Sequence, residues 1–294
     1  MIVSCLNGGL GNQMFQYAAA RSLADASGEN LTLDIRDLKA PLLPRKNRGI
    51  FRPYRLDVFR PRAVLAGRWD LDSRGFLVSR KARLFLAKKG WIRGEYVLEK
   101  DFTYQPLSAA PGRFTYLEGY WQSWRYFEPN RENILADFTL DTEAAGKNLE
   151  ILEKIRSQNS VCLHVRLGDY VNFASASAAH GNLTADYYRA ALRRLGSVGP
   201  RKSFYLFSDE PEKAVRLLGK GLKITVVDHN TQTPQEDLRL MSACRYFVTA
   251  NSSFSWWAAW LSQRPGKRVF SPKKWFAGLA HDTRDLVPKG WIRL

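Results

Sequence analysis

Cysteine is scarce in this sequence of 294 residues, which contains only Cys5, Cys162 and Cys244, each in an apolar stretch and at no close spacing. A secreted disulfide framework normally has an even number of cysteines at short spacings. We therefore expect three reduced cysteines in the core of a cytoplasmic protein.

Long apolar runs are also absent. No uninterrupted run reaches the roughly 18 residues that span a bilayer, and the longest candidate, Phe254 to Leu261, already contains Ser255. Met1 to Leu6 is apolar, but no basic region precedes it and a glycine-rich turn follows it, which does not fit a signal peptide. We exclude an integral membrane protein and expect the mature chain to begin here.

Acidic residues are outnumbered by basic ones, 28 to 45, which gives a net charge of +17. Such a charge attracts phosphates, nucleic acid or acidic lipids. Between Arg36 and Arg93 there are 17 basic and four acidic residues. Within this segment, 76–94 has the pattern of an amphipathic helix, which suits either an anionic membrane surface on the cytoplasmic side or simple solvation. Zinc-finger spacing and an aromatic RNA-binding signature are both missing, so we expect no nucleic-acid partner.

The composition, 45% hydrophobic and 25% charged, is that of a globular protein, and the length suggests two domains. Strand Ile2 to Leu6, helix Gln13 to Ala26 and strand Leu31 to Ile35 form a β-α-β pattern. After a helix from Leu149 to Arg156, strands are predicted at 161–165, 204–207, 224–227, 246–249 and 268–270. Helices are predicted between them at 186–195, 211–218, 235–244 and 255–261. This alternation predicts an α/β protein with parallel, doubly wound sheets and two Rossmann-like domains, 1–148 and 149–294.

Polar residues that follow strands are the candidate site, because ligands bind beyond the carboxyl ends of the strands in such sheets. Segment 7–13 (NGGLGNQ) joins a strand to a helix and includes Gly11, Asn12 and Gln13. Its turn could bind an anionic group at the helix N-terminus or be only a tight connection. It fits the dinucleotide fingerprint in part, with Met14 at the third glycine position and Asp34 near the acidic position.

Three further segments occupy the same kind of place. Period-two alternation puts His164 and Arg166 on one side of a strand, where Arg166 could bind a diphosphate and Asp169 could orient it; the alternative is a buried ion pair beside a core histidine. Asp209 could accept hydrogen bonds from a guanine or ribose, or could cap a helix. The fourth segment offers helix N–H groups and hydroxyls as a phosphate cradle; it contains Asn251, Ser252, Ser253 and Phe254.

Five segments, in this order along the chain, resemble bacterial α-1,2-fucosyltransferases of glycosyltransferase family 11. They are GGLGNQMFQYA (8–18), GYWQSWRYF (119–127), HVRLGDY (164–170), FSDE (207–210) and NSSFSWWAAWL (251–261). Two departures stand out: Leu167 replaces a second arginine that is common in such enzymes, and Glu210 replaces a second aspartate. Phosphate binding would then depend more heavily on Arg166.

The resemblance implies a GT-B-type fold of two facing Rossmann-like domains, with the acceptor on the first and GDP-β-L-fucose on the second. It implies an inverting transfer of fucose to the 2-hydroxyl of a galactose-terminated glycan, with no cofactor beyond the donor substrate. Arg166 would bind the diphosphate, His164 and Asp209 the guanosine, and Ser252, Ser253 and Phe254 would form the phosphate-side loop. Asn12 and Gln13 would face the fucose and phosphate.

Arg166 and helix N–H groups could neutralise the leaving diphosphate, so we expect activity without a metal. A D-x-D pattern at Asp70 and Asp72, typical of metal-dependent transferases, lies in the irregular basic segment. Asp169 or Glu118 could deprotonate the acceptor hydroxyl. Trp121 and Trp124 could stack on an acceptor sugar or belong to the core.

Three other classes stay open at this point. A nucleotide-dependent oxidoreductase would bind a nicotinamide cofactor at the glycine-rich turn. A nucleic-acid-binding protein would use the positive charge, and a non-catalytic sugar-binding protein would bind galactosides without transferring anything.

Overall fold

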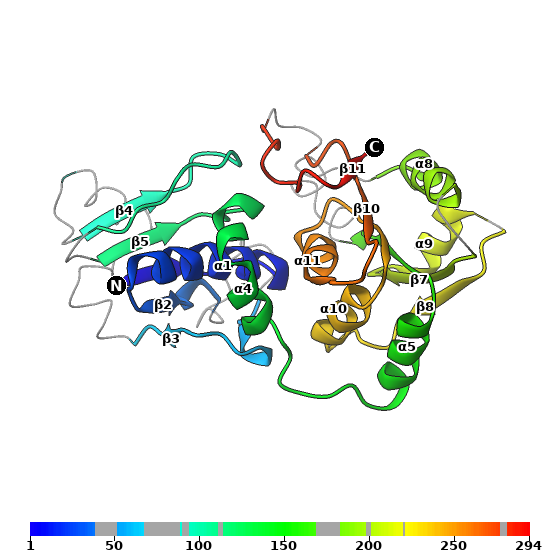
Figure 1. Cartoon of the computed structure of the whole chain (residues 1–294), viewed down its shortest axis with the longest axis horizontal. Coiled ribbons are helices and arrows are strands. Elements are labelled where there is room, and N and C mark those ends of the chain that lie inside the picture. Colours follow the sequence, from blue (N-terminus) through cyan, green and yellow to red (C-terminus); the bar gives the residue numbers. More distant parts are fainter. Residues whose placement is uncertain are drawn as a thin grey trace, which may run out of the picture. The chain divides into compact units, whose positions relative to one another are not determined.

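The computed structural model describes residues 1–38, 52–67, 89, 94–110, 114–168, 183–197, 201–219, 221–276 and 281–294. These residues form two compact units (Figure 1). Unit 1 comprises Met1–Asp141 and Arg284–Leu286, and unit 2 comprises Thr142–Thr283 and Val287–Leu294. Each unit is built on one parallel sheet, and each is described by itself.

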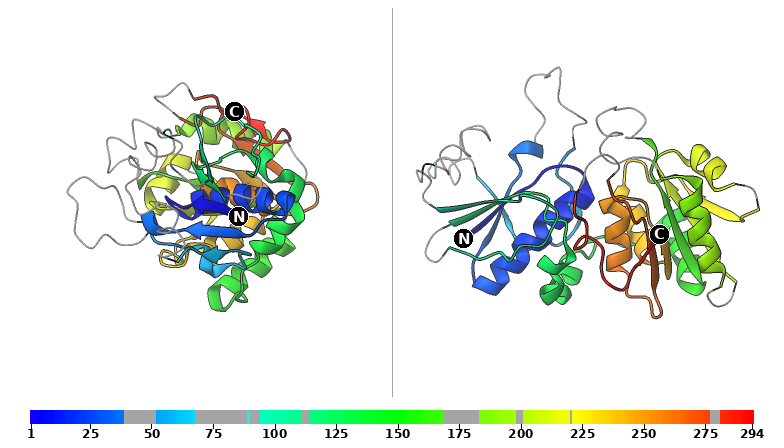
Figure 2. Two further views of the ribbon diagram at one scale, coloured as in Figure 1. Left: turned by 90° about the vertical axis from the view of Figure 1, so that its left-hand side faces the viewer. Right: turned by 90° about the horizontal axis from the view of Figure 1, so that it is seen from above.

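Unit 1 contains a five-stranded sheet in the order β3-β2-β1-β5-β4, with every neighbouring pair parallel. Its strands are β1 (Ile2–Cys5), β2 (Leu31–Asp34), β3 (Val64–Leu65), β4 (Gly94–Leu98) and β5 (Phe114–Glu118). Helix α1 (Leu10–Ser27) connects β1 to β2 and lies beside the strands (Figure 2). The predicted β-α-β pattern is confirmed, although α1 begins three residues before Gln13.

Short helices complete unit 1. They are η1 (Arg36–Leu38), η2 (Leu56–Val58), η3 (Trp124–Tyr126), η4 (Glu128–Asn130) and α4 (Arg131–Asp137). Asp137, at the end of α4, is 2% exposed. It accepts hydrogen bonds from the Tyr17 hydroxyl at 2.7 Å and from Arg21 Nε at 3.1 Å. A buried charge is tolerated when it is paired in this way, so these contacts fix α4 against α1.

Unit 2 contains a six-stranded sheet in the order β11-β10-β9-β6-β7-β8, again with parallel neighbours. Its strands are β6 (Ser160–Val165), β7 (Ser203–Ser208), β8 (Ile224–Val227), β9 (Tyr246–Val248), β10 (Arg268–Ser271) and β11 (Ile292–Arg293). Counted from β6, this is the strand order 3-2-1-4-5-6 of dinucleotide-binding Rossmann folds. The α/β class and the doubly wound sheets are therefore as predicted.

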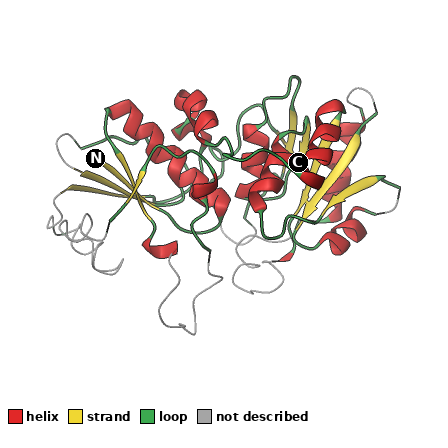
Figure 3. Cartoon of the chain, turned by 90° about the horizontal axis from the view of Figure 1, so that it is seen from below, coloured by secondary structure: helices red, strands yellow, loops and turns green. Residues whose placement is uncertain are grey.

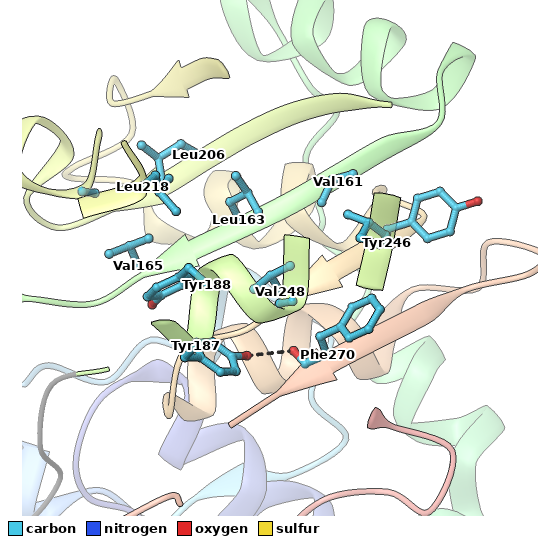
Figure 4. Close-up of a cluster of buried hydrophobic side chains, with 13 residues drawn as sticks. Val161, Leu163, Val165, Tyr187, Tyr188, Leu206, Leu218, Tyr246, Val248 and Phe270 are labelled. Carbon is cyan, nitrogen blue, oxygen red and sulfur yellow. Dashed lines mark hydrogen bonds between the residues drawn. The ribbon is translucent and has the colours of Figure 1, made fainter. Parts of the chain in front are cut away.

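Helices cover the strands of unit 2 (Figure 3). They are α5 (Gly146–Ser157), α8 (Ala185–Gly196), α9 (Pro211–Leu218), α10 (Pro234–Ser242) and α11 (Ser253–Leu261). Buried side chains of α8 and α9 pack against alternate residues of β6, such as Val161 and Leu163. Figure 4 shows this cluster and the Tyr187 hydroxyl, which donates to the Phe270 carbonyl at 3.1 Å. The other side of β6 carries His164, whose ring contacts that of Phe254 in α11.

All three cysteines are free and buried, as expected, and burial raises the pKa of Cys5 and of Cys244 to about 12. Within the described ranges, no helix has the length and apolar character needed to cross a bilayer. The predicted amphipathic helix at 76–94 falls almost entirely outside the described residues, so its membrane contact stays a prediction.

Candidate functional site

The connections of the unit 2 sheet change direction between β6 and β9. β7 and β8 follow on one side of β6, whereas β9 and β10 lie on the other side. Ligands of open α/β sheets bind at such a switch point, beyond the carboxyl ends of the strands. The second and fourth polar segments of the sequence follow β6 and β9, so both lie at this point.

Strand register brings three candidate residues into one row at this edge. The β6–β7 pairing ends at Val165 and Ser208, so one further residue on each strand sets Arg166 beside Asp209. The β6–β9 pairing ends at Leu163 and Val248, and the same register continued past the strands sets Arg166 beside Asn251. Residues far apart in the sequence are thus brought to the same edge of the sheet, and Asp209 is in direct contact with the guanidinium.

Asp209 fixes the chain around Arg166. Its carboxylate accepts from Arg166 Nε at 3.1 Å, from the Leu167 N–H at 2.9 Å and from the Gly168 N–H at 3.0 Å. The side chains of Arg166 and Asp209 are 26% and 25% exposed, so the pair is accessible to a ligand. The sequence assigned the orienting of Arg166 to Asp169, which lies outside the described residues. In the structure it is Asp209 that contacts Arg166 and orients it. The contact of Asp209 with guanosine stays a prediction.

His164 is a neutral, buried neighbour of this pair. Burial lowers its pKa to about 3, and the charge of Arg166 acts in the same direction. The imidazole is therefore uncharged at neutral pH. It is 4% exposed, and its Nδ1 has no hydrogen-bond partner among the described residues. A buried polar atom without a partner costs free energy, which is a feature of sites that receive a ligand.

The N-terminus of α11 lies next to His164. The rings of His164 and Phe254 are 6.2 Å apart, and Ser252 caps the helix by accepting from the Phe254 N–H at 3.3 Å. Asn251 is 3% exposed and donates to the Trp275 carbonyl at 3.2 Å. These contacts bring the predicted phosphate-side loop to the same strand ends as Arg166. Binding of a ligand by Ser252, Ser253 and Phe254 itself stays a prediction.

The glycine-rich turn of unit 1 lies at the equivalent switch point, between β1 and β5. Gly8 has a φ of +75°, and a Cβ there would lie 2.6 Å from Asn12 Nδ2, so this turn requires glycine. Gln16 accepts from the Asn7 N–H at 3.0 Å and donates to the Gly119 carbonyl at 3.0 Å. The turn is therefore joined to the chain that leaves β5.

Asn12 and Gln13 occupy different environments in this turn. Asn12 accepts from Gln122 Nε2 at 2.9 Å and is half-buried. Gln13 is fully buried; its amide donates to the carbonyls of Gly8 and Pro53, each at 2.9 Å, and accepts from the Arg55 N–H at 3.0 Å. Gln13 thus anchors the loop that follows residue 52. The donor contacts predicted for Gly11, Asn12 and Gln13 stay predictions.

The acidic residue of the partial dinucleotide fingerprint already has partners. Asp34 is 2% exposed and accepts from Arg36 Nη2 at 2.7 Å and from the Tyr116 hydroxyl at 2.7 Å. Burial by itself raises the pKa of Asp34, but the bonds and charge of Arg36 bring it below the ordinary value. A nicotinamide-binding site needs this carboxylate for ribose, so its burial argues against an oxidoreductase.

Glu99 is a titratable residue that the sequence reading missed. It directly follows β4, and its carboxylate accepts from the N–H groups of Tyr120 at 2.6 Å and Trp121 at 2.9 Å. Burial raises its pKa from 4.5 to about 7, although these two N–H groups lower it. Trp121 has a φ of +55°, the left-handed region that favours glycine. Because β4 is not predicted from the sequence, nothing in the sequence marks Glu99 as a residue that follows a strand.

The remaining candidate residues of unit 1 are either buried or outside the described residues. Glu118 is 4% exposed and in contact with the Tyr96 hydroxyl, and Trp121, at 2% exposed, belongs to the core. Asp70 and Asp72 lie outside the described residues. Across the described part of the chain, no three His, Cys, Asp or Glu side chains gather as a metal site would require. Independence from a metal stays a prediction.

A family model and several similar proteins all indicate that this chain is a glycosyltransferase. A family model described as glycosyl transferase family 11 matches residues 77–294. An alpha-1,2-colitosyltransferase of Escherichia coli is 30% identical over 100% of this chain and 99% of its own, and the O-antigen biosynthesis glycosyltransferase WbnK of the same organism is 32% identical over 99% of each. The human galactoside alpha-(1,2)-fucosyltransferase 1 is 25% identical over 87% of this chain and 64% of its own.

Solved structures show the same fold. NodZ alpha-1,6-fucosyltransferase soaked with GDP-fucose has a TM-score of 0.53 at 16% identity, over 88% of this chain and 91% of its own. An Arabidopsis thaliana FUT1 variant in complex with GDP has a TM-score of 0.52 at 11% identity, over 92% of this chain and 69% of its own. These likenesses confirm the expected GT-B-type class.

The contact between Gly168 and Asp209 yields a first prediction. A Cβ at residue 168 would lie 2.9 Å from Asp209 Oδ2, so Gly168→Ala should push the carboxylate off Arg166 and the loop. We expect the affinity for GDP, measured by calorimetry, to fall about tenfold, since hydrogen bonds to charged groups contribute roughly 1.5–3 kcal/mol. Gly196→Ala is the control, because its Cβ meets nothing within 4 Å. Equal affinities of the two variants would contradict this role of Asp209.

Glu99 yields a second prediction. Its carboxyl binds more protons in the folded than in the unfolded chain between pH 4.5 and about 7. Its contribution to the free energy of unfolding must therefore fall as pH rises through this window and level off above it. The difference between the wild type and Glu99→Gln, measured by urea unfolding, should fall in the same window. Glu95→Gln, at an exposed residue of β4, is the control for removing a carboxylate near the same strand; a pH-independent difference for Glu99→Gln would refute the raised pKa.

Proposed function

The chain belongs to glycosyl transferase family 11 and is a glycosyltransferase, and from this premise we propose that it transfers L-fucose from GDP-β-L-fucose to the 2-hydroxyl of a terminal galactoside. The product would carry an α linkage, so the configuration at the anomeric carbon is inverted. Relatives whose names specify α-1,2 transfer, with colitose in one and a galactoside acceptor in the other, support this regiochemistry.

The observation that carries the proposal is the guanidinium of Arg166, held by Asp209 at the switch point of the sheet from which the loop to α11 also starts. When the bond from the sugar to the diphosphate breaks, the leaving group gains negative charge. A fixed cation that cannot lose its proton stabilises this charge without reorganisation. The N-terminus of α11 adds the positive end of a helix dipole. Arg166 is therefore the residue that we propose for binding the diphosphate.

The neighbouring residues have supporting roles in this proposal. His164 offers a neutral ring, suited to the uncharged part of guanosine. Asp209 keeps Arg166 in place, and we propose that Asp209 also contacts the guanosine. Asn251, Ser252, Ser253 and Phe254 form the loop on the phosphate side. Gly11, Asn12 and Gln13 are the residues of the unit 1 turn that we propose for the fucose side, with Gln13 acting through the buried hydrogen bonds that hold this turn.

The chemical step requires a base for the acceptor. The acceptor 2-oxygen forms a bond to the anomeric carbon, the bond from that carbon to the phosphate oxygen breaks, and GDP leaves with the electron pair. The hydroxyl proton goes to a carboxylate, and Asp169 is the residue that we propose for this role. It directly follows Gly168, whose N–H is bound by Asp209, so the backbone before it is fixed.

A second donor is favoured by one observation. The colitosyltransferase of E. coli is 30% identical over 100% of this chain. Colitose lacks the 3-hydroxyl of fucose, so a site that hydrogen-bonds this hydroxyl should prefer fucose strongly. Comparing rates with GDP-fucose and GDP-colitose therefore separates the two donors.

The third prediction concerns the proposed reaction. We expect the purified protein to transfer fucose from GDP-fucose to a β-galactosyl disaccharide, with the product linkage assigned by NMR. Arg166→Ala should lower kcat/KM for GDP-fucose at least tenfold, because a charge-assisted contact with the leaving group is lost. Arg268→Ala, at an exposed arginine of β10, is the control. Transfer by Arg166→Ala at the wild-type rate would overturn the assignment.

The fourth prediction concerns metals. If Arg166 and α11 supply the positive charge, excess EDTA should leave the rate of transfer within about twofold of the untreated enzyme. The same incubation with MnCl2 added afterwards tests for recovery. Complete loss of turnover in EDTA, with recovery in manganese, would show that the reaction needs a metal.

A further inference from the structure

Unit 1 contains an open pocket of about 410 Å³. It is lined by Tyr104, Trp124, Arg125, Glu128 and Pro129. Four of these residues belong to or directly follow the GYWQSWRYF segment, and they are part of helices η3 and η4, which follow β5 in the chain. The volume is within the range of about 300–1,000 Å³ that small-molecule sites occupy.

A carboxylate from the distant C-terminal part of the chain holds one wall of this pocket in place. Asp285 accepts from the Tyr104 N–H at 3.0 Å and from Arg125 Nη1 at 3.1 Å, and its carbonyl accepts from the Ser123 hydroxyl at 2.8 Å. The Arg125 guanidinium then lies 4.3 Å from the centre of the Tyr104 ring. Tyr104 is also packed on Tyr126, with ring centres 4.9 Å apart. The wall is thus formed before any ligand binds.

The charges around the pocket balance. Arg125 is paired with Asp285 at 3.1 Å, and Glu128 with Arg131 at 3.5 Å. A phosphate or a carboxylate would have to compete with the two acidic residues already present. A neutral ligand meets no such penalty. Hydrogen-bonding groups beside aromatic rings suit a sugar, which has many hydroxyls and also apolar C–H faces.

The two tryptophans of the segment differ in exposure. Trp121 is 2% exposed and packs edge-on against Tyr126 at 5.6 Å, so it supports the pocket from the core. Trp124 is half-buried and lines the pocket. The sequence treats both as candidates for sugar stacking, and the structure leaves this role to Trp124.

We propose that this pocket binds a pyranose ring of the acceptor glycan. The ring would pack on the aromatic side chain of Trp124, and its hydroxyls would hydrogen-bond to Glu128 and Arg125, with Arg125 held in place over the Tyr104 ring. This inference rests on the proposed function for the identity of the glycan as an acceptor. Trp124 and Arg125 would then determine which acceptors are used, separately from the residues that bind the donor.

The test separates the binding of the acceptor from that of the donor. Trp124→Ala should raise the KM for lactose and for N-acetyllactosamine on the order of fivefold, with the KM for GDP-fucose unchanged. Trp124→Phe should recover most of the affinity, because it retains an aromatic face. Tyr120→Ala is the matched control, since this residue of the same segment is 39% exposed but does not line the pocket.

A binding measurement without donor makes the outcomes distinguishable. In saturation-transfer NMR, lactose should give a signal with the wild type and with Tyr120→Ala, and a much weaker one with Trp124→Ala. Thermal unfolding followed by circular dichroism confirms that each variant is folded, and GDP affinity measured by calorimetry confirms that the donor site is intact. If the wild type transfers fucose but Trp124→Ala has the wild-type KM and lactose signal, the pocket is not the acceptor site. If lactose binding depends on Trp124 but no fucose is transferred, the pocket is a saccharide site and the proposed function is wrong.

Discussion

The ion pair between Arg166 and Asp209 is the interaction on which the unit 2 site depends. Its geometry follows from the register of parallel strands, because β6 and β7 end at the same level and deliver the two residues side by side. Asp209 uses the same carboxylate to bind the Leu167 and Gly168 N–H groups. One side chain therefore sets the direction of the cation and the path of the loop that leads toward Asp169. A guanidinium fixed in this way has little freedom left to lose when it binds an anion.

Each unit has a switch point at the carboxyl edge of its sheet, and different side chains fix the backbone there. In unit 2 a single charge pair and a helix N-terminus lie at the switch point of the sheet, which suits an anionic ligand. In unit 1 the corresponding turns are joined by amide side chains, with Gln16 between Asn7 and Gly119 and Gln122 on Asn12. The carboxylate of Glu99 also bonds this chain, at the Tyr120 and Trp121 N–H groups. The fixed guanidinium of Arg166 is the feature of unit 2 that supports our proposal that the diphosphate binds there.

The sequence predicted the fold of unit 2 well because β6, β7, β8 and β9 are short, apolar and each followed by a helix, although β11 was missed. It missed β4 and β5, since Gly94–Leu98 mixes charged and apolar residues and Phe114–Glu118 is followed by no long helix. The roles of the acidic residues were harder to predict. That Asp209 binds Arg166 depends on strand register, and that Asp34 is occupied by Arg36 and Tyr116 depends on a contact across the sheet. Neither is visible in the spacing of residues.

Protonation at the unit 2 site follows from the same geometry. Burial holds His164 neutral by bringing its pKa to about 3, and an arginine keeps its charge throughout the physiological range. The charge presented to a diphosphate is therefore constant near neutral pH. Glu99, whose pKa is about 7, instead bonds the backbone of the turn that carries Trp121 and leads to Gln122. Near neutral pH the charge of Arg166 therefore stays constant, whereas the carboxyl of Glu99 in unit 1 changes its protonation.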